Sequence, residues 1–454
     1  MRAHVSFTVL VASISVSLAA SDAAAFCGFY VAKADAKLFN EASQVVMVRD
    51  EDKTVLTMVN DFQGSVKEFA VVVPVPTPIT REQIHIGDKK VVEHLDQFTS
   101  VRLVEYFDPD PCAPQREERM ERKRMSSAAP TKDDAGKGRA DALGVTIEAQ
   151  YTVGEYDILI LAAKQSDGLQ TWLKEEGYKI PDGATEVLAS YIKQKMKFFV
   201  AKVNLKEHDK LGGGTLRPIQ VAYESSKFML PIRLGTVNSK GTQDLIAYMI
   251  TKGGRVESTN YRTVKLPSDV NVPSYTKDVF NDFYKAMFAN TVKKYEMKAV
   301  ITEYAWDMSW CDPCAAEPLS SEELRALGVW WVSADANAGN SRGRRGGGGG
   351  QNAFVTRLHV RYDRDHFPED LVFQTTNDRS NFQGRYIMQH AFKGELQCDE
   401  APSYVKRVWD RQQKEATTLA DLTGWALVDV KSKMGLTEQP PEIKGKKWYD
   451  KLWK

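Results

Sequence analysis

The stretch QVVMVRDEDKTVLTMV, residues 44–59, indicates what kind of sheet this chain builds. Two runs rich in β-branched residues flank the polar segment RDEDKT, which is the pattern of two antiparallel strands joined by a short turn. A third apolar run, EFAVVVPV at 68–75, follows closely, and Pro74, Pro76 and Pro78 terminate it. Because proline cannot donate to a strand ladder, we expect this strand to end at a sheet edge.

Further strand and helix patterns occur in clusters and do not alternate regularly. Helical spacing is present at 89–99, 168–177, 183–196, 276–295 and 403–415, the last with Ser403 as the expected N-cap; strand patterns lie at 101–107, 145–163, 197–205, 219–223, 227–234, 244–250, 299–306 and 354–362. Such clustering favours the α+β class over a doubly wound parallel sheet. We predict mostly antiparallel sheet regions with packed helices. The 454 residues, 43% of them apolar, are enough for two core-forming regions.

The first 25 residues have the pattern of a secretory signal peptide. Arg2 is followed by an apolar stretch and then by small residues, so cleavage is expected after Ala25. A lipoprotein signal before Cys27 is disfavoured, because Phe26 is bulky. No later stretch has 18 consecutive apolar residues. We therefore expect an exported protein, periplasmic or extracellular, with no transmembrane segment in the mature chain.

The mature chain is predicted to consist of one long domain broken by two insertions. We expect a β-rich N-terminal part (26–112), a flexible charged insertion (113–143), a central α+β part (144–334), a glycine-rich loop (335–352), a C-terminal part (353–435) and a basic aromatic tail (436–454). The two insertions cannot bury a core. The tail is expected either to touch an anionic surface or to dock on the protein's own body.

The overall charge excludes one class of partner. The chain has 61 basic and 60 acidic residues, so no global field attracts nucleic acid or a membrane. The arginine- and glycine-rich string at 342–350 resembles segments that bind single-stranded nucleic acid, but export removes that target. No nucleic-acid partner is expected, whereas a protein or an envelope surface is a possible partner.

Five cysteines are the most informative single residues in the chain. Cys27, Cys112, Cys311, Cys314 and Cys398 all lie in the mature part, where an oxidising compartment makes each a disulfide candidate. Five is an odd number, so one thiol is left over, pairs between chains or is exchanged. The connectivity stays open.

The string Trp310-Cys311-Asp312-Pro313-Cys314 follows a strand pattern, as in the first half of a thioredoxin active site. Such a dithiol needs its first cysteine at a helix N-terminus, where the thiolate is stabilised. The downstream chain, however, enters a glycine-rich loop and lacks the expected continuation. We favour a structural disulfide, either across this short loop or from one of the pair to Cys398. A metal site would require further ligands.

Three other strings suggest sites only weakly. Six nitrogen and oxygen ligands crowd residues 359–370, beginning with His359 and ending with Asp370, but they lack calcium-loop spacing, and a packed strand histidine is the simpler interpretation. Gly339–Gly343 matches a nucleophile elbow without its strand and helix. Gly212–Gly214 is followed by no phosphate-loop lysine.

Several separated blocks resemble one family. They are CGFYVAKADAKLFNEASQVVMVRD, FAVVVPVPTP, VGEYDILIL with GLQTWLKEEGYKIP, and VTRLHVRYDRDHFPEDLVFQ. In this order they are similar to the exported bacterial proteins grouped as domain of unknown function 2330, over most of residues 26–400. The resemblance implies export and one shared fold. It supplies no catalytic residues.

The sequence therefore predicts an exported protein with a non-catalytic binding or envelope-structural role. The alternative is a thiol-disulfide oxidoreductase that uses Cys311 and Cys314. We identify no catalytic, cofactor-binding or metal-binding residues outside that alternative, and no cofactor is expected.

Overall fold

The structure is a computed structural model. It describes residues 29–32, 43–59, 69–113, 146–162, 169, 172–173, 175, 183–210, 216–237, 241–310, 312, 317–333 and 352–441. The predicted signal peptide, most of both predicted insertions and the last part of the tail lie outside these residues, as do Cys27, Cys311 and Cys314. Among the described residues, no helix is long and apolar enough to cross a membrane.

The chain is an α+β protein, as predicted. Its strands are β1 (Phe29–Ala32), β2 (Ser43–Asp50), β3 (Lys53–Val59), β4 (Phe69–Val75), β5 (Ile84–Ile86), β6 (Arg102–Phe107), β7 (Thr146–Val153), β8 (Tyr156–Ala162), β9 (Lys197–Val203), β10 (Ile219–Glu224), β11 (Met229–Leu230), β12 (Gln243–Thr251), β13 (Val256–Ser258), β14 (Arg262–Lys265), β15 (Val270–Asn271), β16 (Ala299–Asp307), β17 (Phe354–Tyr362), β18 (Leu371–Thr375), β19 (Phe382–Gln383) and β20 (Arg385–His390). Its helices are α1 (Lys89–Thr99), α3 (Ala184–Lys193), α4 (Leu205–Lys210), α5 (Phe280–Lys294), α6 (Ser321–Ala326), α7 (Ala401–Thr423) and α8 (Leu427–Met434), with short 3-10 turns η1 (Arg81–Gln83), η2 (Gly235–Val237) and η3 (Ser274–Lys277).

The largest sheet has the order β14-β16-β17-β12-β2-β3-β10-β5, with β19 beside β16. The predicted hairpin is confirmed: β2 and β3 pair from Gln44 opposite Val59 to Asp50 opposite Lys53. Its turn contains Glu51 at a φ of +50°. At the centre of the sheet, β2 pairs in parallel with β12. Strands from the N-terminal, central and C-terminal parts of the chain therefore share one sheet.

A second sheet, with the order β1-β4-β9-β8-β7, packs on the first. Alternate residues of the two sheets meet in a shared core, for example Val71 and Phe199 from the smaller sheet with Met47 and Met249 from the larger one. Where Pro74 lies, β4 pairs with β9, and the pairing with β1 recorded in the described residues stops at Val72. Within the described residues, only β9 pairs with β4 at the position of the proline.

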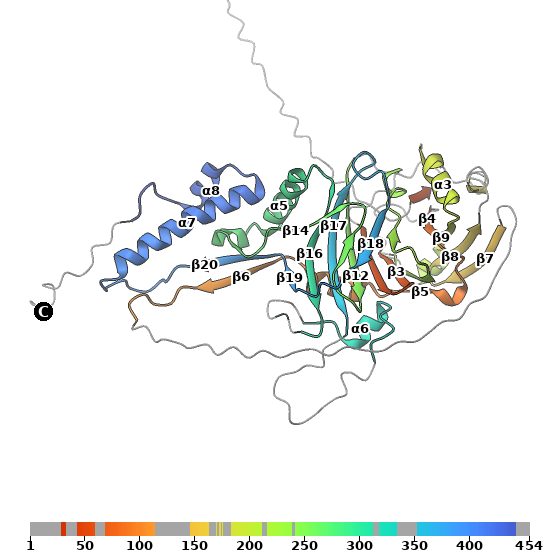
Figure 1. Ribbon diagram of the computed structural model, residues 1–454, viewed down its shortest axis with the longest axis horizontal. Coiled ribbons are helices and arrows are strands. Elements are labelled where there is room, and N and C mark those ends of the chain that lie inside the picture. Colours follow the sequence, from red (N-terminus) through yellow and green to blue (C-terminus); the bar gives the residue numbers. More distant parts are fainter. Residues whose placement is uncertain are drawn as a thin grey trace, which may run out of the picture.

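Helices cover the outer faces of both sheets. On the larger sheet, α1 and α6 bury Leu95 and Leu324 against Val46 and Val355. On the smaller sheet, α3 buries Leu188 and Tyr191. The helix α1 coincides with the predicted helix at 89–99, because its apolar residues recur at helical spacing and Asp88 accepts a bond from Lys90 N–H as N-cap. The result is a sandwich with a helical layer on each side (Figure 1).

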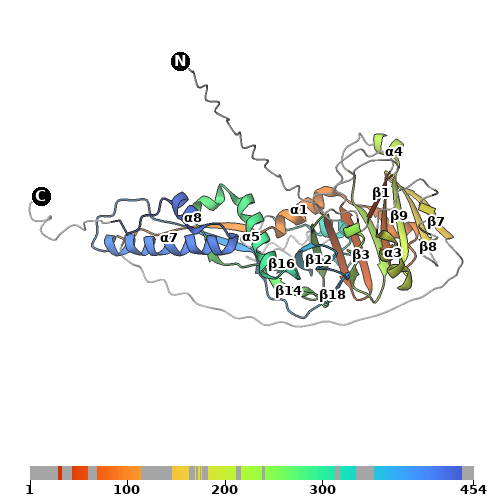
Figure 2. The ribbon, with the colours of Figure 1, turned by 90° about the horizontal axis from the view of Figure 1, so that it is seen from above.

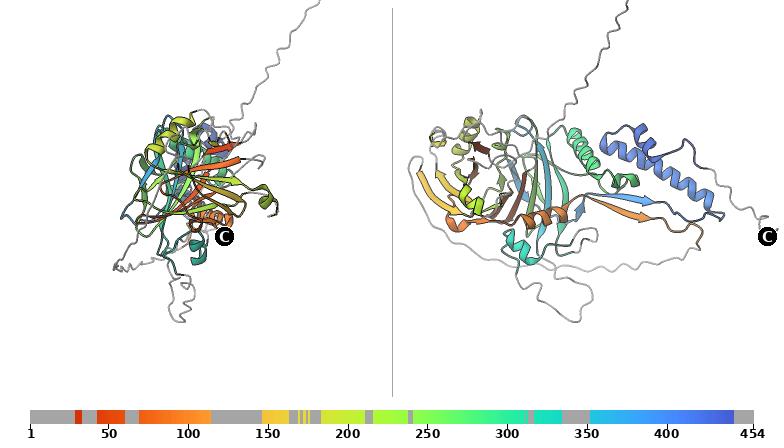
Figure 3. Two further views of the ribbon diagram at one scale, coloured as in Figure 1. Left: turned by 90° about the vertical axis from the view of Figure 1, so that its right-hand side faces the viewer. Right: turned by 180° about the vertical axis from the view of Figure 1, so that it is seen from behind.

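An elongated extension continues from one end of the sandwich (Figures 1 and 2). Its sheet, β15-β20-β6, is parallel, and α5, α7 and α8 pack on it through a fourth core cluster that includes Phe283, Tyr386 and Leu419. A disulfide joins Cys112, after β6, to Cys398, before α7, at a sequence separation of 286. The extension lies at the end opposite α3 and β7, as the rear view also shows (Figure 3).

Two local expectations were wrong. The helix expected from Ser403 begins at Ala401 with Glu400 as N-cap, and the Ser403 hydroxyl instead donates back to the Glu400 carbonyl. The strand expected at 227–234 is only two residues long, β11, because Pro231 and a turn at 232–237 end it.

Candidate functional site

Two neighbouring hollows form one groove between the small sheet β11-β18-β13 and the end of the sandwich. The first has a volume of about 620 Å³ and the second about 380 Å³. Both are lined by Phe228 and Phe373, whose ring centroids are 5.4 Å apart. We call the two hollows together the groove. Concave sites of this size are where proteins commonly bind ligands.

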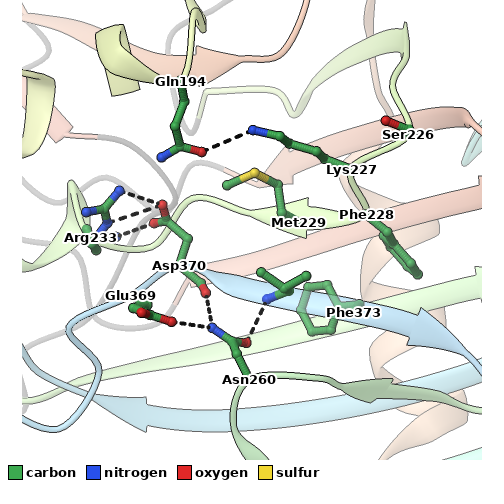
Figure 4. A pocket seen from close by; sticks show the side chains of 11 residues that line it. Gln194, Ser226, Lys227, Phe228, Met229, Arg233, Asn260, Glu369, Asp370 and Phe373 are labelled. Carbon is green, nitrogen blue, oxygen red and sulfur yellow. Dashed lines mark hydrogen bonds and ion pairs between the residues drawn. The ribbon is translucent and has the colours of Figure 1, made fainter. Parts of the chain in front are cut away.

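Asp370 organises the first hollow (Figure 4). Its Oδ1 accepts from the Tyr191 hydroxyl at 2.6 Å and from the backbone N–H groups of Ile232 and Arg233 at 3.0 and 3.2 Å. Its Oδ2 accepts from Nε and Nη2 of Arg233 at 3.2 and 3.0 Å. Both oxygens of this buried carboxylate are therefore occupied by donors from the protein itself.

Arg233 and Tyr191, which bond to Asp370, also contact each other. The Arg233 guanidinium lies 4.8 Å above the Tyr191 ring. Burial, followed by the nearby Asp370 charge, raises the pKa of Tyr191 well above its usual value. Burial lowers the pKa of Arg233, but the hydrogen bond to Asp370 and the Asp370 charge together outweigh burial and raise that pKa above its usual value. Tyr191 therefore stays neutral and Arg233 stays charged near neutral pH, and the two side chains form a fixed wall around Asp370.

Asn260 fixes the opposite wall of the first hollow. Its side-chain oxygen accepts from Val372 N–H at 3.0 Å, and its amide donates to the Asp370 carbonyl at 2.8 Å and to Glu369 at 3.3 Å. Lys227 reaches across the top to the Gln194 amide oxygen at 3.3 Å (Figure 4). Lys227 and Glu369 are exposed and loosely held, so a ligand would meet one charge of each sign.

The second hollow has a different lining. Arg49 lies 5.2 Å above the Phe228 ring and donates to the Thr54 hydroxyl at 2.8 Å. Lys252 pairs with Asp50 at the far rim. Gly253 approaches β18 so closely that a Cβ there would stand 2.8 Å from the Thr375 side chain. The groove as a whole has an aromatic middle and polar ends, an arrangement that suits an elongated ligand.

A separate buried charge cluster lies between the larger sheet, α1 and α5. The fully buried Glu303 accepts from Arg357 Nε at 2.7 Å, from the Tyr284 hydroxyl at 2.6 Å and from His359 Nδ1 at 2.9 Å. Arg357 also donates to Asp96 at 2.7 Å. Burial raises the pKa of Glu303, but the charges of His359 and Arg357 outweigh it and lower that pKa to about 2. Glu303 therefore stays ionised inside the protein.

The predicted ligand-rich segment 359–370 is not one site. His359 packs in the buried cluster, with its ring 3.6 Å from that of Phe288, while His366 pairs with Asp363 and Asp370 faces the groove. No group of three or more metal-ligating side chains is assembled anywhere in the part of the chain that the structure describes. His359 is a buried histidine on β17, in agreement with the simpler interpretation of this residue.

The cysteine expectations have mixed outcomes. Cys398 bonds to Cys112, so the considered bridge from Cys311 or Cys314 to Cys398 was wrong. Those two cysteines lie outside the described residues, and the oxidoreductase question is untested. Asp312 between them is buried and accepts from the Tyr304 hydroxyl at 3.2 Å and from Gln383 at 3.0 Å. Trp310 is 69% exposed.

The sequence did not reveal the groove. Its residues come from distant segments, with a sequence separation of 138 between Ile232 and Asp370 and of 110 between Asn260 and Asp370. The available signal was that charged residues and a proline lie next to short apolar runs at 227–234 and 367–374. Such a pattern indicates the end of a strand near a loop, but it does not predict which strand ends become neighbours in the fold.

Comparison with known proteins gives one match. A family model described as "Uncharacterized protein conserved in bacteria (DUF2330)" covers residues 21–374. The match ends within β18, so it includes the residues that line the groove except Thr375, and it excludes α7 and α8. No curated protein and no solved structure is similar enough to match.

Proposed function

This chain belongs to the family of uncharacterized proteins conserved in bacteria called DUF2330, and from that membership we propose that it is an exported, non-catalytic binding protein of the bacterial envelope. The Cys112–Cys398 disulfide supports export, since such bonds persist in oxidising compartments. The groove is the proposed binding site.

One observation supports a binding role over a catalytic one. A general base or nucleophile needs a free lone pair or an exchangeable proton at the reacting atom. The carboxylate at the centre of the groove, Asp370, instead accepts five bonds from Tyr191, Ile232 and Arg233. It is a support for the walls, and the groups left for a ligand are the exposed Lys227 and Glu369.

The alternative function is thiol-disulfide exchange by Cys311 and Cys314. What supports it is Trp310, which is 69% exposed and directly precedes Cys311. An exchanging dithiol requires such an accessible setting. An insulin-reduction assay with dithiothreitol tests it: rate enhancement that disappears in Cys311→Ser would favour the oxidoreductase over our proposal.

The binding role is tested by thermal unfolding of the full chain in the presence of three ligand panels: envelope glycan fragments, free amino acids with small anions, and short unstructured peptides. A groove-blocking variant, Ser226→Trp, places a bulky ring at an exposed position that lines the first hollow. The matched control is Ser432→Trp, at an exposed position on α8 in the extension.

We expect at least one panel to raise the unfolding temperature of the wild type and of Ser432→Trp but not of Ser226→Trp, with the ligand recovered unchanged. If no panel acts in this groove-dependent way, or if the ligand is converted, the proposed function is wrong.

A further inference from the structure

Among the described residues, the register of the small sheet leaves part of one strand edge without a pairing partner. On one side, β18 pairs with β13, and the flanking bonds run from Thr376 N–H to the Arg255 carbonyl and from Thr259 N–H to the Val372 carbonyl. In an antiparallel ladder, this pattern turns the backbone groups of Thr375 away from β13. The N–H and C=O of Thr375 therefore point to the side where β11 lies.

On that side β11 stops too early to cover Thr375. It pairs Met229 with Val372 and Leu230 with Leu371, and Phe373 N–H then donates to the Phe228 carbonyl. On the N-terminal side of Phe228, the chain turns away from β18, and Ser225 N–H donates to the Asp52 carbonyl at the turn between β2 and β3. The position opposite Thr375 is thus not taken by this neighbour.

The second hollow of the groove lies at this open edge. Thr375 and Gln374 line it and are exposed, and Phe228, where the chain leaves β18, lines it as well. An open edge beside a cavity offers a donor and an acceptor at strand spacing together with room for side chains.

We infer that the groove binds an extended polypeptide segment, which adds as a strand to β18 at Thr375, in line with β11. This inference rests on the proposed function and names its ligand class. A strand supplies both a C=O for Thr375 N–H and an N–H for Thr375 C=O, which a glycan or a small anion does not do at that spacing. The aromatic pair Phe228 and Phe373 lies beside the added strand.

The charges of the groove fit such a ligand. Successive side chains of a strand point to opposite faces, so a segment lying along the groove presents alternate residues to its lining. Lys227 and Glu369 at the first hollow and Lys252 with Asp50 at the second offer both signs of charge. We therefore expect main-chain recognition that tolerates many side chains.

The test uses a defined probe, a fluorescent peptide of alternating threonine and valine with a lysine at each end. A second peptide has the same sequence but is N-methylated at every internal residue, which removes its donors on both edges, so that neither edge can donate to the Thr375 carbonyl. Fluorescence anisotropy is measured with the full chain, with Ser226→Trp and with Thr375→Pro. Proline at 375 removes the N–H at the open edge without removing a donor of the β13 ladder, and a thermal melt checks its folding.

We expect saturable binding of the unmodified peptide to the wild type and about tenfold weaker binding of the N-methylated peptide, the loss expected for one to two hydrogen bonds. Ser226→Trp and folded Thr375→Pro should weaken binding to a similar extent. Equal binding of the two peptides to the wild type would overturn the inference. This comparison does not depend on whether any variant folds. If glycans or small anions bind in the groove and peptides do not, this inference fails while the proposed function stands. If nothing binds there, both fail.

Discussion

Replacing Glu303 by glutamine should destabilise the protein in a way that depends on pH. The wild-type carboxylate has a pKa of about 2 in the folded chain, against an ordinary value of 4.5. A difference of this size corresponds to about 3 kcal/mol of stability, which is fully present above pH 4.5 and is lost as the pH falls through 2. Between pH 5 and pH 3, linkage predicts a loss of about 2 kcal/mol from this residue alone.

Urea unfolding of the wild type and Glu303→Gln at pH 7, 5 and 3 measures this effect. At pH 7 and 5 the variant should be less stable by about 3 kcal/mol, since Arg357 keeps its burial but loses one charged partner. At pH 3 the gap should shrink to about 1 kcal/mol. Glu93→Gln, the same change at an exposed position on α1, is the control and should show no such trend. A gap that is constant from pH 5 to pH 3 would refute the reasoning.

Three further outcomes are expected. Burial raises the pKa of Glu415 from an ordinary value of 4.5 to about 7, so the wild type is destabilised wherever the group is ionised in the unfolded chain. Glu415→Gln should therefore raise the melting temperature strongly at pH 8 and hardly at all at pH 4, where the group is largely protonated in both states; an equal rise at both pH values would contradict this. A Cβ at Gly254 would stand 2.3 Å from the Asp378 carbonyl oxygen, so Gly254→Ala should cost about 1–3 kcal/mol in urea unfolding. Gly241→Ala, with nothing within 4 Å of its Cβ, should cost far less, and equal losses would argue against this close approach. Peptide mapping without reductant should recover a fragment linking Cys112 to Cys398, and recovery of either cysteine only with another partner would disprove that bond.

Elements with a strong local pattern were predictable from the sequence. The hairpin of β2 and β3 and the helix α1 follow from β-branched runs and from helical spacing, and nothing distant competes with them. The start of α7 was misjudged because a serine is a common N-cap, whereas Pro402 sits in the first turn and moves the start to Ala401.

Features that depend on distant contacts were not predictable. The buried cluster joins Arg357 to Asp96 across 261 residues, and the groove brings Asn260 next to Asp370 across 110. The pairing of Cys112 with Cys398 likewise depends on which strands become neighbours. Residue spacing carries no information about such pairs, because sheet order sets them.

The position of β2 at the centre of the larger sheet has a consequence for how the chain must fold. One edge of β2 is covered by its hairpin partner at once, but the other waits for β12, and 204 residues separate Gln44 from its neighbour Tyr248. Because the chain is synthesised from its N-terminus, one edge of the apolar strand β2 stays unpaired until more than half of the chain has been made. Unpaired strand edges of this kind promote aggregation. During that interval this fold should depend on a holding chaperone more than a protein built from consecutive hairpins does.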